Sequence, residues 1–108
     1  IHPRLKSMTL PVSVQICTLN EADNIVECLE SVRLNEPEDV LVIDGGSIDD
    51  TVKLAVQTGA RVIEAGPIGL ARQRRVGYLN SPSTLTAFVD ADDRLEQDWL
   101  STMVHELN

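Results

Sequence analysis

The sequence has 108 residues, of which 43% are hydrophobic, 24% are charged and 3% are aromatic. This composition is typical of one soluble globular domain and excludes a disordered chain. The 17 acidic residues outnumber the 9 basic ones and leave a formal charge of −8, so a nucleic-acid partner, whose phosphates need excess Lys and Arg, is excluded.

Residues 1–10 show no periodicity, and we interpret them as a leader or remnant that precedes a domain over residues 11–108. The apolar run over residues 12–17 predicts a strand, and the polar stretch "TLNEADN" follows it. A helix is then expected, because apolar residues recur at the i, i+3, i+4, i+7 spacing of one helix face. These residues are Ile25, Cys28, Leu29 and Val32.

The middle of the chain predicts a second strand and a second helix. Residues 35–39, "NEPED", are expected to form a loop, and "VLVID" over residues 40–44 reads as a strand covered on both faces. Gly45 and Gly46 then supply a turn, and Ser47 with Asp50 resembles a capping box at a helix start. This helix is expected to end at Gly59 and to point three residues inward, Val52, Ala55 and Val56.

The last third of the chain repeats the alternation. Strands are predicted over residues 60–65 and 84–90, with a helix over residues 70–79 between them. A final helix from about Gln97 carries Leu100, Met103, Val104 and Leu107 on one face. Alternating strands and helices predict an α/β fold, a Rossmann-like parallel sheet with helices on both faces.

Polar residues follow three of the predicted strands, at the points where the strands end. Because ligands bind beyond the carboxyl ends of parallel strands, these residues are expected to line one site. They are Thr18, Asn20 and Glu21 after the first strand, Asp44 to Ser47 after the second, and Asp90, Asp92 and Asp93 after the fourth.

The stretch "DADD" places carboxylates close enough to repel one another. Side chains two residues apart in extended backbone point the same way, so Asp90 and Asp92 can converge while Ala91 turns aside. Oxygen ligands of this kind favour a hard cation, Mg²⁺ or Mn²⁺. The alternative is a solvated turn in which Asp92 or Asp93 caps the last helix. In the metal-binding interpretation Asp93 falls on the other side and caps that helix.

Arginines gather in "GLARQRRVG", where Arg72, Arg74 and Arg75 make up three of the nine basic residues. Guanidinium groups bind phosphate well, so the cluster indicates an anion nearby. A solvated basic helix face is the equally weighted alternative.

Cys17 and Cys28 are the two cysteines, and they are interpreted as buried free thiols. No apolar stretch reaches the roughly 18–20 residues of a membrane span. Because two cysteines do not make a disulfide framework, we expect a reducing, cytoplasmic location, with the cytoplasmic face of a membrane as the alternative.

Taken together, four stretches resemble the family 2 glycosyltransferases of the GT-A fold in order and spacing, over about residues 11–105. They are "VSVQICTLNEADNIVECLESV", "VLVIDGGSIDDTVKLA", "GLARQRRVGY" and "FVDADDRLEQDWL". The resemblance implies a domain that binds a nucleotide-sugar donor, with a D-x-D motif for a divalent metal, Mg²⁺ or Mn²⁺. It implies metal binding by Asp90 and Asp92, and donor binding by Thr18, Asn20, Glu21, Asp44, Arg72, Arg74 and Asp90.

The resemblance implies metal-dependent transfer of the sugar, with inversion, to an unidentified sugar or lipid-linked acceptor. In such enzymes the general base and most of the acceptor site follow the metal motif. We therefore expect residues 1–108 to be the donor-binding half, without turnover alone, and to self-associate through the apolar face of the last helix.

The sequence departs from the family pattern at several positions. The family commonly has an aromatic residue at Leu19 and a second acid at Gly45, both of which help to hold the base. These departures favour the alternative function, a non-catalytic nucleotide-binding, metal-binding or interaction domain of the same fold. A sugar-phosphate nucleotidylyltransferase is disfavoured, because "CTLNEADN" contains neither glycine nor a basic residue.

Overall fold

The computed structural model describes residues 9–107, in which strands and helices alternate along the chain. The elements are β1 (Leu10–Thr18), α1 (Ile25–Arg33), β2 (Pro37–Asp44), α2 (Thr51–Thr58), β3 (Arg61–Glu64), α3 (Leu70–Leu79), β4 (Leu85–Phe88) and α4 (Trp99–Leu107). Most of the expected leader lies in residues 1–8, outside the described residues. Leu10, which was expected in that leader, is the first residue of β1.

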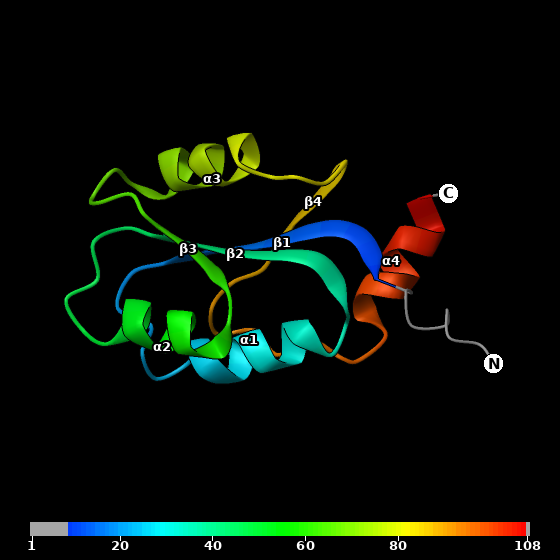
Figure 1. Cartoon of the computed structure of the whole chain (residues 1–108), viewed down its shortest axis with the longest axis horizontal. Coiled ribbons are helices and arrows are strands. Elements are labelled where there is room, and N and C mark those ends of the chain that lie inside the picture. Colours follow the sequence, from blue (N-terminus) through cyan, green and yellow to red (C-terminus); the bar gives the residue numbers. More distant parts are fainter. Residues whose placement is uncertain (1–8, 108) are drawn as a thin grey trace.

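The four strands form one parallel sheet in the order β3-β2-β1-β4. Helices α1 and α2 cover one face, α3 lies on the other, and α4 lies at the end of the sheet near the start of β1 (Figure 1). The predicted α/β class, parallel sheet and two helical layers are confirmed. The chain leaves β1 for β2 on one side and returns to β4 on the other, so the strand order reverses between β1 and β4. Such a reversal is where ligands bind in open α/β sheets.

The two faces of the sheet differ in chemistry because side chains alternate along each strand. Val12, Val14 and Ile16 of β1 are fully buried against the apolar face of α1, as predicted for that helix. Ser13 and Gln15 point to the opposite face and are also fully buried. The layer under α1 and α2 is therefore the apolar core, whereas α3 covers a partly polar layer.

Helix α3 lies on the sheet through Gln73 and Gly77, the residues it buries. The Gln15 Nε2 donates a hydrogen bond of 2.6 Å to the Gly77 carbonyl. A Cβ added at Gly77 would lie 2.3 Å from Gln15 Oε1 and 2.7 Å from Ile43 Cδ1. Glycine at this position therefore lets the helix backbone approach the strands closely.

Strand β2 begins at Pro37, so the predicted loop over residues 35–39 is wrong for its last three residues. Asp39 pairs with Ser13 across the sheet, and its carboxylate accepts bonds from Ser13 Oγ (2.6 Å) and Arg61 Nε (2.8 Å). Burial alone would raise the pKa of Asp39, but the bonds from Arg61 and Ser13 outweigh it and hold the pKa below its usual value. These partners, distant in sequence, make an acidic residue acceptable inside the sheet.

The prediction for α2 was wrong at two positions. Val56 was expected to point inward but is 57% exposed. The residues that this helix buries are Thr51 and Ala55. Ser47 does not cap the helix, since its hydroxyl donates to Asp44 Oδ1 at 2.6 Å. Gly59 ends the helix in the left-handed conformation, as predicted.

Strands β3 and β4 are shorter than predicted. Residues pair with a neighbouring strand only over Arg61–Glu64 in β3 and Leu85–Phe88 in β4. The amides of Ala65 and Val89 still donate to Asp44 and Gln15 of the neighbouring strands, and the chain then enters the connecting loops. Asp90 therefore lies on a turn beyond β4 rather than inside a strand.

Helix α4 begins at Trp99, two residues later than predicted, and packs on the core. Leu100 is fully buried, Met103 and Val104 pack against the core, and Leu107 is 63% exposed. The face expected to mediate self-association is therefore mostly covered, and the structure gives that expectation no support. The start of the helix is held by the buried Asn35, whose Oδ1 accepts a 2.9 Å bond from the Leu100 amide.

Within residues 9–107 no helix combines the length and apolar character needed to cross a bilayer. Both cysteines are free thiols, Cys28 buried and Cys17 partly buried.

Candidate functional site

The ends of β1 and β2 are joined by side-chain hydrogen bonds centred on Asp44. Thr18 Oγ1 donates to Asp44 Oδ1 at 2.7 Å, and the amides of Gly46 and Ser47 donate to Asp44 Oδ2 at 3.0 and 2.8 Å. Burial acts to raise the pKa of Asp44, but the bonds from Ser47, Thr18 and Gly46 outweigh it and lower the pKa. Asp44 is thus an ionised residue that holds the loop after β2 in shape, and it is only 2% exposed.

The loop after β1 is fastened to the loop after β2. Asn20 has a positive φ of 55°; its amide donates to Ser47 Oγ and its Oδ1 accepts from the Ile48 amide, both at 2.8 Å. The Glu21 amide donates to Thr51 Oγ1 at 2.8 Å. These bonds give the "TLNE" stretch a fixed shape, with Asn20 exposed and Glu21 partly exposed.

A pocket of about 480 Å³ opens at the carboxyl ends of β1 and β2. Two of the predicted donor-binding residues, Thr18 and Glu21, line it. The start of α3 forms the opposite wall. The remaining lining residues are Cys17, Leu19, Gly45, Gly46, Pro67, Gly69, Leu70 and Gln73.

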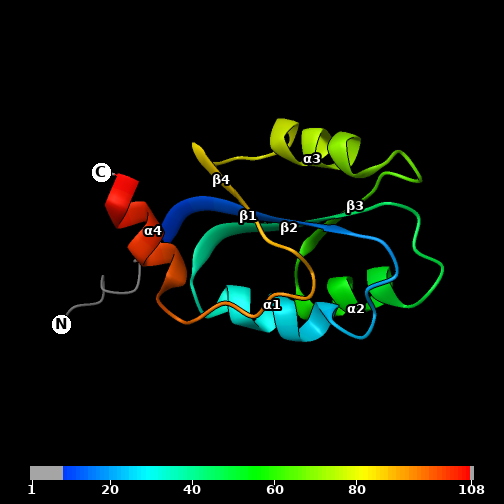
Figure 2. The same ribbon diagram turned by 180° about the vertical axis from the view of Figure 1, so that it is seen from behind.

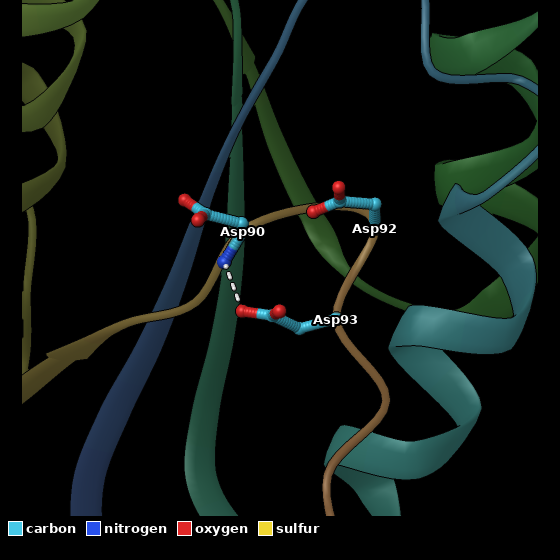
Figure 3. A group of neighbouring side chains, drawn as sticks. All are labelled: Asp90, Asp92 and Asp93. Atoms are coloured by element: carbon cyan, nitrogen blue, oxygen red, sulfur yellow. Dashed lines mark hydrogen bonds between the residues drawn. The ribbon is translucent and has the colours of Figure 1, made fainter.

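The three aspartates of "DADD" lie together on the turn that follows β4 (Figure 3). A carboxylate oxygen of each of Asp90, Asp92 and Asp93 lies within 4.8 Å of the others, and all three residues are exposed. Ala91 is 3% exposed and points inward, so Asp90 and Asp92 do turn outward together, as predicted.

Asp93 belongs to this cluster, and the prediction that it caps α4 was wrong. Its amide donates to the Asp90 carbonyl at 2.9 Å, and its Oδ2 accepts from the Asp90 amide at 3.2 Å. These bonds close the turn several residues before α4 starts. The cap expected from Asp93 is supplied at the Leu100 amide by Asn35, a residue that lies far from α4 in the sequence.

The turn is anchored to α1, beside which the chain runs between β4 and α4 (Figure 2). Arg94 donates to the carbonyls of Ala91 and Asp93 and to the Glu27 carboxylate, the last at 2.9 Å. The Leu95 amide donates to Ser31 Oγ at 3.0 Å. The carboxylates are therefore held on a braced loop at the strand-order reversal.

This donor set fits a hard divalent cation. Three carboxylates offer oxygen ligands only, and their mutual repulsion falls when a cation binds between them. Their exposure leaves room for ligands from a bound molecule, which is how Mg²⁺ is usually held beside phosphates.

The predicted arginines are not equivalent in the structure. Arg74 Cζ lies 5.8 Å from the Phe88 ring centroid, and Arg74 lines a small hollow of about 20 Å³ that also touches Asp90. Arg72 and Arg75 are exposed on α3, and neither side chain makes a hydrogen bond or ion pair within residues 9–107. Of the three predicted arginines, Arg74 is therefore the one that lines the same hollow as Asp90.

The pocket and the aspartates form one continuous surface. Cys17 and Leu70 line both the pocket and the small hollow that reaches Asp90. Burial raises the pKa of the Cys17 thiol, while Arg74 acts to lower it and Asp90 to raise it. An elongated ligand could therefore extend from the pocket past Cys17 to the aspartates.

The sequence did not single out Gln73, which lies 6% exposed in the pocket wall and donates to the Thr18 and Ile43 carbonyls. In the sequence Gln73 is flanked by Arg72 and Arg74, which favours the interpretation that it lies on the solvent-exposed face of the helix. The nearby Gly77, at helical spacing from Gln73, is the only sequence signal that this side of α3 approaches the sheet.

Sequence comparison gives one consistent result. The model of the glycosyl transferase family 2 matches residues 13–108. Glycosyltransferase AglE of Haloferax volcanii is 35% identical over 111 residues, which cover 93% of this chain and 36% of AglE. An uncharacterised glycosyltransferase of Rickettsia conorii is 31% identical over 93 residues, or 86% of this chain and 33% of that protein. The chain thus spans about a third of the length of these relatives.

Structure comparison supports the same fold. Glucosyl-3-phosphoglycerate synthase from Mycobacterium tuberculosis, solved with Mn²⁺, uridine diphosphate (UDP) and glucosyl-3-phosphoglycerate, matches with a TM-score of 0.78 at 23% identity. The match covers 94% of this chain and 40% of the synthase. At this identity the likeness establishes the fold.

Proposed function

The chain belongs to glycosyl transferase family 2, and from this premise we propose that it binds the donor in a metal-dependent transfer of a sugar from a nucleoside diphosphate. The observation that carries the proposal is the single surface on which the pocket and the aspartate cluster meet. The nucleoside lies in the pocket, and the diphosphate extends past Cys17 toward Asp90 and Asp92.

The aspartates account for the metal dependence. Asp90 and Asp92 hold Mg²⁺ or Mn²⁺, and Asp93 braces the turn through its bonds with Asp90. When bound, the cation offsets negative charge on the departing diphosphate. The complex of the mycobacterial synthase with Mn²⁺ and UDP supports this assignment, because that protein shares the fold.

The other donor-binding residues divide into contact and support roles. Glu21 faces the ligand in the pocket, and Thr18 lines the pocket with its hydroxyl already donated to Asp44. Asp44 and Asn20 fix the loops that form the pocket wall, since both carboxylate oxygens of Asp44 and Oδ1 of Asn20 accept bonds within the protein. Arg74 places a positive charge beside the aspartates, where an anionic ligand needs it.

The whole transfer is proposed to invert the sugar carbon, with the acceptor hydroxyl attacking from the side opposite the diphosphate. Another mycobacterial synthase complex contains UDP-glucose and phosphoglyceric acid, and this fits a sugar donor with a separate acceptor. We place the reaction in the cytoplasm, where the two free thiols stay reduced.

Calorimetric titration of the 108-residue chain tests the proposal. UDP, GDP and dTDP are titrated with and without Mn²⁺, first with the parent chain and then with Asp92→Asn. We expect one of these nucleotides to bind only with Mn²⁺, and Asp92→Asn to weaken that binding by at least about tenfold, because a metal ligand is lost.

The matched control is Glu30→Gln, which removes a carboxylate charge on the exposed side of α1. It should bind as the parent does. Binding that is unaffected by either Mn²⁺ or Asp92→Asn would contradict the metal assignment, and no binding of any nucleotide would favour an interaction domain of the same fold.

A further inference from the structure

The wall of the pocket contains the largely buried amide of Gln73, whose oxygen accepts no hydrogen bond within residues 9–107. Gln73 lies in the first turn of α3 and lines the pocket together with Gly45 and Leu70. Its side chain is almost completely buried, so the direction of its polar atoms is set by the fold. The donor-binding roles assigned above do not use this residue.

The orientation of the Gln73 amide is fixed by its neighbours. Nε2 donates to the Thr18 carbonyl at 3.1 Å and to the Ile43 carbonyl at 2.9 Å. Carbonyl oxygens only accept, so the nitrogen must face them and the amide cannot be flipped. Both hydrogens of Nε2 are therefore used, and nothing within residues 9–107 donates to Oε1.

Gly45 makes room for this arrangement. A Cβ added to Gly45 would lie 2.9 Å from Gln73 Oε1 and 3.0 Å from Nε2. A side chain at residue 45 and the amide of Gln73 therefore compete for the same space beside the pocket. The backbone of Gly45 does not have a positive φ, so the small size of this residue is what matters.

The apolar part of the pocket suits a flat ring. Leu19 and Leu70 line it and are 56% and 52% exposed, which leaves aliphatic surface free to pack against a ring face. A ring held there brings its edge toward the polar part of the wall, where Gln73 lies. An acceptor that cannot turn distinguishes ring edges that donate from edges that accept.

We propose that Gln73 Oε1 accepts a hydrogen bond from a ring N–H of the donor's base and so selects the nucleotide. This inference rests on the proposed function. It favours uracil and thymine, whose N3 carries a hydrogen, and guanine, whose N1 does. It disfavours cytosine and adenine, in which the corresponding ring nitrogen is itself an acceptor and would leave two acceptors facing each other.

The test compares UDP with cytidine diphosphate (CDP), two pyrimidine nucleotides of the same size, by calorimetry of the 108-residue chain with Mn²⁺. UDP should bind roughly 10- to 100-fold more tightly, as expected when a buried acceptor loses its donor. UDP methylated at N3 should fall to the level of CDP, and this comparison leaves the protein unchanged.

Two variants link the selectivity to Gln73. Gln73→Met keeps the length of the side chain and removes the acceptor, so UDP should lose its advantage over CDP. Gly45→Ala displaces the amide without removing it, and it should also lower UDP affinity more than CDP affinity. Circular dichroism checks that both variants fold, and the test with methylated UDP holds even if Gln73→Met does not.

The possible failures can be told apart. Equal binding of UDP and CDP, with binding still dependent on Mn²⁺ and Asp92, would overturn the role of Gln73 and leave the proposed function intact. If no nucleotide binds with Mn²⁺, the proposed function fails and the role of Gln73 fails with it.

Discussion

Replacing Gly77 by alanine tests how closely α3 must approach the sheet to form the pocket. In an exposed helix this change would stabilise the protein by about 1 kcal/mol, because alanine is the better helix former. Here the added Cβ would lie 2.3 Å from Gln15 Oε1 and 2.7 Å from Ile43 Cδ1, both on fully buried residues. The expected sign is therefore reversed.

The size of the effect follows from the contacts that must change. Forcing an extra carbon into a packed site costs about 1–3 kcal/mol, and both short distances place this site at the upper end. Loss of the bond from Gln15 to the Gly77 carbonyl adds about 1 kcal/mol. After subtraction of the gain in helix propensity, the free energy of unfolding should fall by about 2–3 kcal/mol, and Tm by roughly 10–15 °C.

Urea unfolding followed by circular dichroism and by the fluorescence of Trp99, the single tryptophan, measures this change. Arg75→Ala on the exposed side of α3 is the control and should alter stability by less than about 0.5 kcal/mol. The folded fraction of Gly77→Ala should also bind UDP more weakly, since Gln73 and Arg74 lie about one turn away. A Gly77→Ala variant that is more stable than the parent would refute the close packing of α3.

Three further predictions concern other parts of the molecule. The free energy of unfolding should fall as pH drops below about 4, because hydrogen bonds keep the pKa of Asp39 and Asp44 below the unfolded value, and that stabilisation is lost on protonation. Urea titrations at pH 7, 4 and 3 measure the fall, which should be shallower in Asp39→Asn; an unchanged slope would be contrary evidence. Asn35→Ala removes the acceptor of the Leu100 amide and should destabilise the protein by about 1–3 kcal/mol. Hydrogen exchange should then speed up first in α4, and uniform exchange would argue against this role. Mn²⁺ should raise the Tm of the parent but not that of Asp92→Asn. At a Mn²⁺ concentration of 100 times the dissociation constant, the parent should gain about 2.7 kcal/mol in free energy of unfolding. Equal shifts in both proteins would place the metal elsewhere.

The spacing of apolar residues along the chain was enough to predict the helices that bury one regular face. The helix over residues 70–79 has the predicted bounds, and the apolar face of α1 is the predicted one. The polar strand ends also meet on one edge of the sheet, because parallel topology follows from the order of the elements.

Residues that depend on partners distant in sequence were not predicted. Asp39 was placed in a loop because its partners Ser13 and Arg61 are 26 and 22 positions away. Asn35 caps a helix that starts more than sixty positions later. Gln73 looks solvent-exposed in the sequence, and only the close approach of α3 shows that its amide lies in the pocket wall. Periodicity carries no information about such pairings.

The most direct test of the central claim is a crystal of the 108-residue chain grown with Mn²⁺ and UDP, measured for anomalous scattering from manganese. We expect a manganese peak between the carboxylates of Asp90 and Asp92, with the diphosphate beside it and the uracil in the pocket against Gln73. A manganese peak away from these aspartates, or UDP bound outside this pocket, would contradict it.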